Sequence, residues 1–330
     1  MANSVKELEK AHKSEEKAMR KQVKHEFRNK KSLKTILKQE WPLHLMLLLP
    51  VTLVIIFNYL PMGGIIIAFK NFDPFKGIFG SPWVGLDNFR YIMSLPSTPQ
   101  ILYNTIFIAI WKIVLNLVVP IAVALLLNEL RNKVFIRSVQ TIIYLPHFIS
   151  WVILAGVFID ILSPSSGIVN EILGFFGLDS VFFLGDRSWF PKTMIITDVW
   201  KSFGYGTIVY LAALTGINQD LYEAAKIDGA NRWKQTWHVT LPGMIPIIVL
   251  MTTLSLGNVL NAGFDQIYNL LSPNVYETGD IIDTFVYRMG MIEQQYSIST
   301  AVSTFKSLVS FVLISVSYFL ASKFANYRIF

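Results

Sequence analysis

The chain has 330 residues, of which 53% are hydrophobic and only 15% are charged, whereas about a quarter of the residues of a soluble domain are charged. This balance excludes a typical soluble protein and indicates an integral membrane protein. Cysteine is absent and the five histidines are scattered without metal-ligand spacing, which excludes disulfides and thiolate chemistry and makes a metal site unexpected.

The net charge of +7 comes almost entirely from residues 1–40, which hold 12 Lys or Arg against 6 Asp or Glu. A basic segment beside an apolar span is explained better by the positive-inside rule and by anionic lipids than by nucleic acid, so no nucleic-acid partner is expected. These 40 residues are too long and too polar for the start of a signal peptide. They are predicted to be a retained cytoplasmic tail, with an interfacial helix near residues 33–37.

Six windows in residues 41–330 are long and apolar enough to form transmembrane helices, which need about 20 mostly apolar residues. The fourth and fifth are the least apolar. The sequence therefore predicts an all-α, polytopic membrane protein with six transmembrane helices. The predicted spans are residues 42–68, 101–127, 140–162, 193–216, 247–271 and 299–323.

The charges on the connections predict the orientation. Residues 129–139 carry three basic residues against one acid, and the C-terminal end carries Lys323 and Arg328 against none. By the positive-inside rule both belong in the cytoplasm with the basic tail, which gives an N-in, C-in protein. The connections 69–100, 163–192 and 272–298 then face outward, and residues 217–246 face the cytoplasm.

Polar residues also occur within the predicted spans, where ionisable groups are costly and mark either a pathway or a buried pair. Asp198, Lys201 and Tyr205 share one face of the fourth span at i, i+3 and i+7. They are candidates for a substrate pathway, and the alternative is that Asp198 and Lys201 simply pair with each other. Lys112 and Asn116, in the second span, are interpreted as structural.

The cytoplasmic stretch 217–246 is the most polar run between two apolar ones. Asp220 is expected to cap a first helix, with Glu223 completing a capping box, and two alanines leave a flat face that another protein could approach. Gly229 is placed to end this helix in the left-handed conformation. Asn231 can cap a second helix, whose apolar stripe is Trp233, Trp237 and Leu241. The residues alone leave an interfacial connector and a docking element equally open.

The same stretch resembles a known motif. The run Glu223-Ala224-Ala225, then Gly229 and Val239-x-Leu241-Pro242, matches the EAA motif of binding-protein-dependent ABC importer permeases, E-A-A-x3-G-x9-I-x-L-P, with Val239 in place of Ile. Residues 204–214 and the region after Gly229 are similar to the carbohydrate-uptake branch, the oligosaccharide and polysaccharide permeases of the maltose type. The likeness covers roughly residues 40–325.

This resemblance implies a type I ABC importer permease fold in which the EAA loop is a coupling helix that docks in a cleft of an ATPase subunit. No Gly-Lys dipeptide occurs in the chain, so a Walker loop is absent and the chain is not expected to be an enzyme. ATP and Mg would bind to the ATPase subunits. The residues that the resemblance assigns to coupling are Glu223, Ala224, Ala225, Asp228, Gly229, Arg232, Leu241 and Pro242.

The resemblance also implies the partners: a second permease in a heterodimer, two ABC ATPase subunits, an extracytoplasmic substrate-binding protein, membrane lipid and an oligosaccharide substrate. It places the chain in the cytoplasmic membrane of a prokaryote. The charge and identity of the sugar stay open.

The fifth and sixth predicted spans carry further polar stripes, which should face away from lipid. A hydrophilic cavity of amides, carboxylates and rings would suit sugar hydroxyls and ring faces, whereas the alternative is that Ser, Thr and Asn join neighbouring helices. The candidate pathway residues are Asn258, Asn261, Asp265 and Tyr268 on the fifth span, and Ser303, Lys306 and Ser307 on the sixth.

A second function of a different class is an ion-gradient-driven secondary transporter or channel, which would more often carry broken helices around intramembrane carboxylates and would need no docking loop. A membrane enzyme is a third, but the chain lacks a recognisable catalytic constellation.

Overall fold

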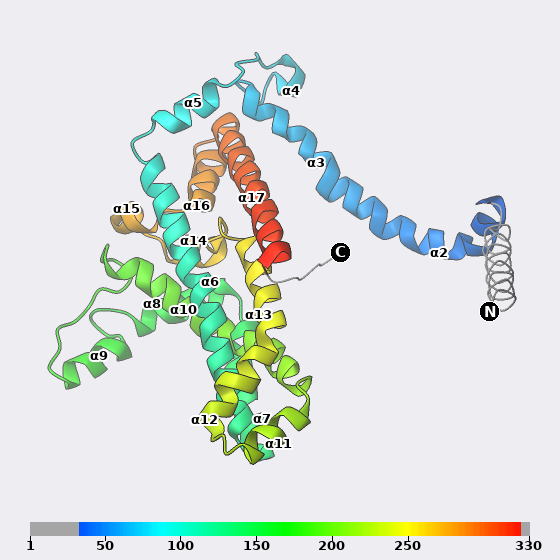
Figure 1. Cartoon of the computed structure of the whole chain (residues 1–330). Helices are drawn as coiled ribbons and strands as arrows, with labels where there is room; N and C mark the ends of the chain where they lie inside the picture. The colour runs from blue at the N-terminus through cyan, green and yellow to red at the C-terminus, as the bar shows by residue number, and fades with distance from the viewer. Residues whose placement is uncertain (1–32, 325–330) are drawn as a thin grey trace, which may run out of the picture. The chain divides into compact units, whose positions relative to one another are not determined.

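The computed structural model describes residues 33–324, and all regular elements in that range are helices (Figure 1). The chain divides into two parts, residues 1–64 and 65–330. The predictions for residues 1–32 of the basic tail and for Arg328 lie outside the described residues.

The described portion of the first part is an almost unbroken helical run. Residues 33–37 belong to α2 (Leu33–Val54) rather than to a separate interfacial helix. A π-helical turn follows just before Pro61, which lacks an N–H and cannot donate to the carbonyl four residues back. Residues Glu40–Phe69 are long and apolar enough to cross a membrane, as predicted for the first span. The further elements are η1 (Ile55–Tyr59), α3 (Leu60–Met62) and η2 (Gly63–Phe69), which runs on into the second part.

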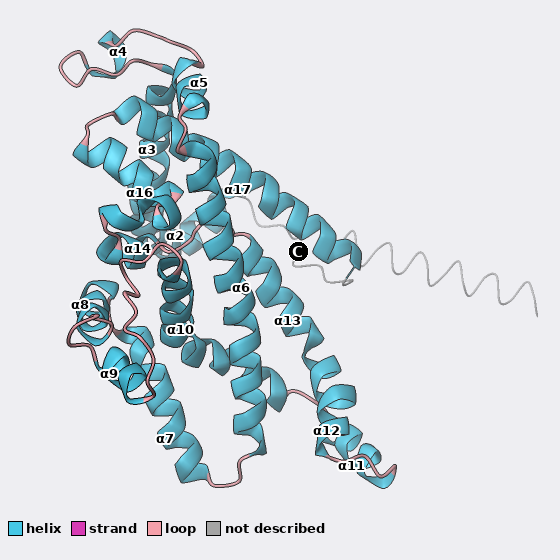
Figure 2. Ribbon diagram, turned by 90° about the vertical axis from the view of Figure 1, so that its left-hand side faces the viewer, coloured by secondary structure: helices cyan, strands magenta, loops and turns pink. Residues whose placement is uncertain are grey.

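The second part is built on two long helices, α6 (Thr98–Glu129) and α10 (Trp189–Thr215), which lie along each other (Figure 2). A Cβ on Gly206 would press against the ring of Pro120 at 3.1 Å, so the missing side chain permits this close approach. The shorter elements are α4 (Gly77–Gly80), α5 (Asp87–Ser94), α9 (Ile168–Phe175), η5 (Pro273–Val275), α15 (Tyr276–Gly279), α16 (Ile282–Tyr287) and η6 (Arg288–Ile292).

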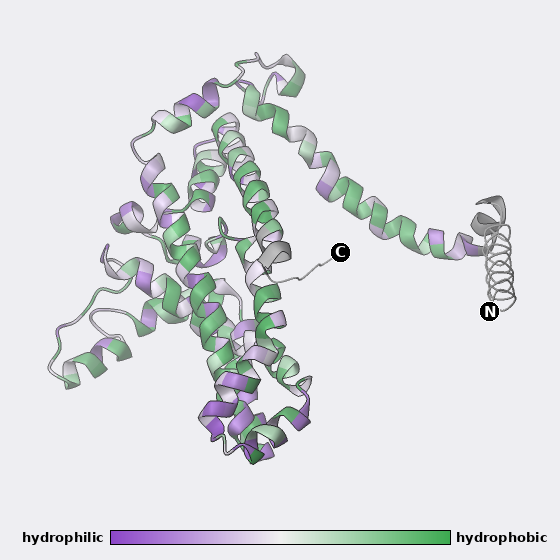
Figure 3. Cartoon of the chain, in the orientation of Figure 1, coloured by the Kyte–Doolittle hydropathy of each residue, from purple (hydrophilic) through white to green (hydrophobic). Residues whose placement is uncertain are grey.

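The core of this second part is apolar and is shared between α6, α10 and the segment that follows residue 263. Ile108, Phe190, Met194 and Ile267 are fully buried together. Burial of this kind is the main favourable term in folding, at about 1.5–3 kcal/mol for each large side chain. Polar residues gather instead at the end that carries the 217–246 stretch (Figure 3).

The third predicted span is not one straight helix. α7 (Lys133–Tyr144) and the short η3 (Leu145–Phe148) meet α8 (Trp151–Ile161) at an angle of 105°. Pro146 cannot donate the hydrogen bond that would continue α7, and the Ser150 side chain caps α8 by accepting from the Ile153 N–H. The prediction of a continuous helix over 140–162 is therefore wrong.

The fifth predicted span is also displaced. The helix runs from Arg232 to Leu256 through α12 (Arg232–Gln235), the π-helical η4 (Thr236–Thr240) and α13 (Leu241–Leu256). A turn then interrupts it, and α14 (Phe264–Leu270) begins only after Gly263, whose φ of 94° lies in the left-handed region. Residues 247–271 are thus not one helix, because the turn falls inside that window.

Four helices among the described residues are long and apolar enough to cross a membrane, or five if the bent α7–α8 pair forms one span. α17 (Tyr296–Phe324) contains the sixth predicted span. α10 matches the fourth predicted window in position, but it carries Asp198 and Lys201 and is not among the apolar helices. The all-α membrane architecture is confirmed, with long helices at four of the six predicted windows, a bent pair at the third and a helix interrupted by a turn at the fifth.

Candidate functional site

The first helix of the polar loop, α11 (Gln219–Ile227), begins one residue before the predicted cap. Asn218 is its N-cap, with Oδ1 accepting from the Asp220 N–H at 3.0 Å, so the prediction that Asp220 caps the helix is wrong. Asn and Asp are nearly equal as caps, and residue type alone does not choose between them. Asp220 lies in the first turn instead, where a negative charge suits the helix dipole.

The turn at Gly229 is as predicted. Its φ is +75°, a conformation that residues with a Cβ seldom adopt. The Ala230 N–H donates to the Ala225 carbonyl at 2.8 Å, and the Gly229 N–H donates to the Lys226 carbonyl at 3.0 Å. These two bonds form a Schellman motif, which satisfies the last carbonyls of α11.

The second helix of the loop is capped by Asn231, as predicted, with Oδ1 accepting from the Lys234 N–H at 2.9 Å. Buried Gln235 donates through Nε2 to the Ala230 carbonyl at 2.8 Å and so holds the turn against α12. Because α12 continues through η4 into α13, the turn is joined directly to a membrane-length helix.

The predicted coupling residues lie at the surface of this loop. Those around the turn are free of intramolecular packing on their outer side, as a docking element requires. Glu223, Ala224, Asp228, Gly229, Arg232 and Pro242 are exposed, and Ala225 and Leu241 are half-buried. Arg232 forms an ion pair at 3.5 Å with Glu129 at the end of α6, but both side chains are well exposed, so the pair contributes little to stability.

A contact that sequence reasoning missed ties α11 to the start of α13. The Tyr222 hydroxyl lies 3.0 Å from the Thr240 hydroxyl, and both line a polar hollow of about 170 Å³ between α11, α12 and the end of α6. The sequence did not predict a role for Tyr222, because its partner Thr240 lies 18 positions away. Movement of α11 would therefore be transmitted to α13 through this pair.

We expect Tyr222→Phe to weaken this link. One net hydrogen bond contributes about 0.5–1.5 kcal/mol, so the loop should open more readily while the helices persist. Hydrogen exchange of the α11 amides should rise by about 2- to 12-fold. Tyr91→Phe, at an exposed tyrosine of α5, is the matched control and should leave α11 exchange unchanged. Equal exchange in the Tyr222→Phe variant and the unmodified chain would contradict the link.

Asp198 and Lys201 do not pair in the structure. Lys201 donates to the His147 carbonyl at 2.8 Å, beside the bend between α7 and α8. Asp198 accepts from Asn116 Nδ2 at 3.0 Å and lies 3.4 Å from Lys112 Nζ. The alternative of an Asp198–Lys201 pair is therefore wrong.

Lys112 is the centre of a buried polar cluster that the sequence did not predict. Its ammonium donates to the Ala262 carbonyl at 2.7 Å and to the Gln266 side chain. Gln266 in turn donates to the Met194 carbonyl at 2.8 Å and to the Thr197 hydroxyl at 2.7 Å. The cluster connects α6, α10 and the turn before α14, and buried polar groups require such partners.

Gly263 makes this cluster possible. A Cβ at its position would lie 2.9 Å from Lys112 Nζ. A side chain there would displace the ammonium, and the left-handed φ adds a second requirement for glycine. The turn that breaks the fifth predicted span is thus fixed by a long-range contact to α6.

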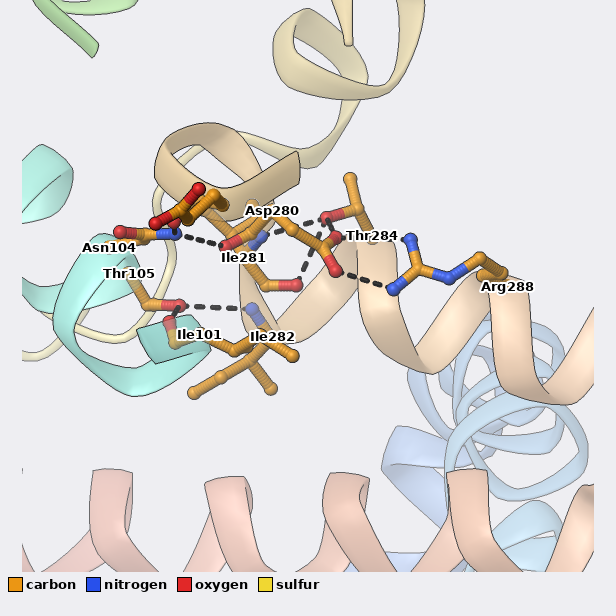
Figure 4. Close-up of polar contacts among 9 residues, drawn as sticks. Ile101, Asn104, Thr105, Asp280, Ile281, Ile282, Thr284 and Arg288 are labelled. Atoms are coloured by element: carbon orange, nitrogen blue, oxygen red, sulfur yellow. Dashed lines mark hydrogen bonds and ion pairs between the residues drawn. The ribbon is translucent and has the colours of Figure 1, made fainter. Parts of the chain in front are cut away.

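A second buried cluster holds the start of α16 (Figure 4). Buried Asp280 accepts from the Thr284 hydroxyl at 2.7 Å and forms an ion pair with Arg288. Asn104 of α6 donates to the Asp280 carbonyl at 3.1 Å, and the Thr105 hydroxyl accepts from the Ile282 N–H at 2.9 Å. These bonds join the N-terminal part of α6 to α16.

The guanidinium of Arg288 is stabilised in its charged form by Asp280. Burial acts to lower the pKa of its guanidinium, but the hydrogen bond and the charge of Asp280 outweigh burial, and the pKa is raised above its usual value. Arg288 lies in η6, outside the apolar spans.

A hollow of about 520 Å³ brings together residues from α14, α16 and α17. Its wall includes two predicted pathway residues, Asn261 and Lys306, and Lys306 Nζ pairs with Asp283 Oδ1 at 2.5 Å. Three rings pack at its edge: Phe264, Tyr268 and Tyr287 have centroids 4.7–5.5 Å apart. Amide, charge and ring faces therefore occur together in one concave surface.

The other predicted pathway residues are less concentrated. Asn258 and Asn261 lie in the turn before α14, so they do not share one helix face with Asp265 and Tyr268 as predicted. Tyr205 stacks on His147 with ring centroids 4.1 Å apart, near the α7–α8 bend. On α17, Ser303 is half-buried and Ser307 is exposed.

Residues 116–326 match the family model described as binding-protein-dependent transport system inner membrane component. The chain is 40% identical to the polygalacturonan/rhamnogalacturonan transport system permease protein YteP of Bacillus subtilis, over 92% of this chain and 95% of that protein. It is 38% identical to protein LplB of Bacillus subtilis, over 89% of this chain and 92% of that protein.

Solved structures give a consistent result. The fold is similar, with a TM-score of 0.82 and 38% sequence identity, to a chain of a bacterial ABC transporter involved in the import of the acidic polysaccharide alginate. The match covers 88% of this chain and 99% of that one. A second structure, of the bacterial alginate ABC transporter in complex with an alginate pentasaccharide-bound periplasmic protein, also has a TM-score of 0.82, at 37% identity over 89% of this chain and 98% of that one.

Proposed function

The chain belongs to the family of inner membrane components of binding-protein-dependent transport systems, and on that premise we propose that it is the permease subunit of an ATP-driven importer of oligosaccharides or polysaccharide fragments. The observation that carries the proposal is the exposed turn at Gly229, with a small-residue helix before it and a membrane-length helix after it. The family and the relatives argue against an ion gradient as the energy source.

The coupling mechanism follows from the continuity of the backbone. An ATPase subunit would bind α11 through the exposed side chains of Glu223, Ala224 and Asp228. Because α12 runs into α13 without interruption, displacement of the turn would tilt α13 and open or close the pathway. ATP and Mg would be bound by two ATPase subunits, and a second permease would complete the pore as a heterodimer.

We propose the six-span, N-in and C-in topology on the same basis. The bent α7–α8 pair supplies one span, and α10 supplies another despite its polar residues. Asp198 is satisfied by Lys112 and Asn116, and Lys201 by the His147 carbonyl, so α10 presents few unpaired polar groups to lipid. The Gly229 turn then faces the cytoplasm, in the inner membrane of a prokaryote.

The 520 Å³ hollow is proposed to line the substrate pathway. Its amide and its ion pair can bond sugar hydroxyls, and the neighbouring rings can stack on sugar faces. The relatives named for polygalacturonan and the importer of alginate handle acidic polysaccharides, which favours an oligosaccharide that contains uronic acid. Such a substrate would be delivered by an extracytoplasmic binding protein.

The proposal is tested by purifying the chain with the products of its neighbouring genes and reconstituting the complex in liposomes. Uptake of a uronic acid oligomer should require ATP inside the liposomes and the binding protein on the opposite face. If no ATPase co-purifies, or if the chain alone transports the sugar down an ion gradient, the proposal is wrong.

The pathway assignment gives a separate prediction for Asn261. Asn261→Ala removes a hydrogen-bonding group of the hollow, which should lower the uptake rate at saturating binding protein by about 2- to 12-fold, as expected for 0.5–1.5 kcal/mol. Basal ATP hydrolysis should be unchanged. Asn269→Ala, in α14 but absent from the lining of the hollow, is the matched control. Equal uptake by the two variants would remove Asn261 from the pathway.

A further inference from the structure

The loop between Phe69 and Val84 carries two phenylalanines that its own fold leaves uncovered. The side chains of Phe75 and Phe79 are 100% and 97% exposed. Single exposed apolar residues are ordinary on protein surfaces, but here two large rings four positions apart on one loop are both almost fully exposed.

The tip is nevertheless well fixed. Buried Ser81 accepts from the Asp73 N–H at 3.0 Å and donates to the Gly77 carbonyl at 2.7 Å, and the Asp73 carboxylate accepts from the Phe75 N–H at 2.9 Å. Gly77 has a φ of +66°, which permits the turn between the two rings. The exposure of Phe75 and Phe79 is therefore a property of an ordered turn.

The base of the loop is closed on the end of the apolar helix. The Phe69 carbonyl accepts from the Val84 N–H at 2.9 Å, and Trp83 stacks on Phe69 with ring centroids 5.7 Å apart. Phe69 is also the last residue of the membrane-length run Glu40–Phe69. Both ends of the loop therefore lie at the end of the membrane-length run, at Phe69.

Lys70 limits the distance between the loop tip and the end of the membrane-length run at Phe69. It follows Phe69 directly, and its Nζ donates to the Ile78 carbonyl at 2.6 Å and to the Ser81 carbonyl at 3.3 Å. The backbone next to Phe79 is therefore held within one lysine side-chain length of the end of the helix. The chain re-enters an apolar helix at Thr98, so the whole connection is confined near the same face of the membrane.

We propose that Phe75 and Phe79 insert into the interfacial layer of the bilayer and anchor this connection to the lipid surface. Trp and Tyr are enriched at this depth, and interfacial segments also insert Phe there as part of their apolar face. Lys76 pairs with Asp73 and Lys70 donates to backbone carbonyls of the loop, so the loop's net charge is only +1 and the attraction rests on the apolar rings. The proposed topology makes this the outer leaflet, and the anchoring itself does not depend on transport.

The absence of cysteine from the chain allows a direct test. Phe75→Cys and Phe79→Cys are labelled singly with a nitroxide in the complete importer in lipid nanodiscs, without binding protein. Collision of the label with oxygen, which partitions into lipid, is compared with collision with a water-soluble nickel chelate. Lys76→Cys, on the same loop and exposed, is the matched control.

We expect the labels at positions 75 and 79 to collide more often with oxygen than with the nickel chelate. The label at position 76 should collide more often with the nickel chelate. Nickel accessibility at positions 75 and 79 equal to that at 76 would overturn the proposal. Protection from both reagents that appears only when sugar-loaded binding protein is added would also overturn it, because the surface would then dock a protein. Retained ATP hydrolysis identifies labelled complexes that are correctly assembled, and the collision data stand even if the transported substrate differs from the one proposed.

Discussion

Gly229→Pro is expected to abolish the stimulation of ATP hydrolysis by substrate and binding protein. Proline cannot donate to the Lys226 carbonyl, and its φ near −65° is incompatible with the observed +75°. An unfavourable proline costs about 3 kcal/mol or more, so the native turn should be populated about 100-fold less. The proposed docking surface of α11 would then no longer be held at a fixed angle to α12. Stimulated ATP hydrolysis in proteoliposomes measures the loss.

The control for this variant uses the glycine of a second Schellman motif, at the end of α9. Gly177 follows α9 with a φ of +73°, and its N–H donates to the Gly174 carbonyl at 3.0 Å. Gly177→Pro makes the same backbone change in a predicted outward connection and should leave ATPase assembly and stimulation intact. Equal losses in the two variants would indicate a general folding defect, and normal stimulation with Gly229→Pro would contradict the coupling role of the turn.

Lys112→Met is expected to have the largest effect on stability. The substitution nearly preserves the volume of the side chain but removes the ammonium that faces Asp198, Gln266 and the Ala262 carbonyl. Removing one partner of a buried pair costs about 3–5 kcal/mol, because the remaining charge is left without compensation. Thermal unfolding of the purified chain in nanodiscs measures the change.

Two further variants separate this mechanism from a general effect of losing a lysine. Lys192→Met, on the exposed face of α10, should change stability by no more than about 0.5 kcal/mol. Lys112→Met combined with Asp198→Asn should recover part of the loss, since the uncompensated carboxylate is gone. A single Lys112→Met variant as stable as the unmodified chain would show that the cluster is not needed to hold α6, α10 and α14 together.

The features that the sequence predicted correctly in the polar loop at 217–246 depend on near neighbours. Gly229 and Ala230 end α11 by donating to carbonyls three and five positions back, respectively, and Asn231 caps α12 by accepting from the N–H three positions on. Such interactions span one helical turn, so the order of residues is enough to predict them. The cap at Asn218 instead of Asp220 shows the limit, because two suitable caps two residues apart differ too little in energy for residue type to decide.

The departures in the membrane region have a different cause. A hydropathy window averages over about 20 residues and cannot detect where a helix breaks inside it. The bend after Pro146 and the turn at 257–263 both fall inside apolar windows, and the second is held by Lys112, about 150 positions away. The periodic face of Asn258, Asn261, Asp265 and Tyr268 was wrong for this reason, since periodicity applies only while the helix continues.

By itself the sequence determined that this is an all-α membrane protein with apolar spans and a polar loop that turns at Gly229, because hydrophobicity and local capping are properties of neighbouring residues. Only the tertiary structure decided which groups pair inside it. Asp198 bonds to Lys112 and Asn116 rather than to Lys201, and Asn261 meets Lys306 in one hollow, because these contacts depend on how separate helices pack. Packing brings together residues that are far apart in the chain, and a local sequence pattern does not predict such contacts.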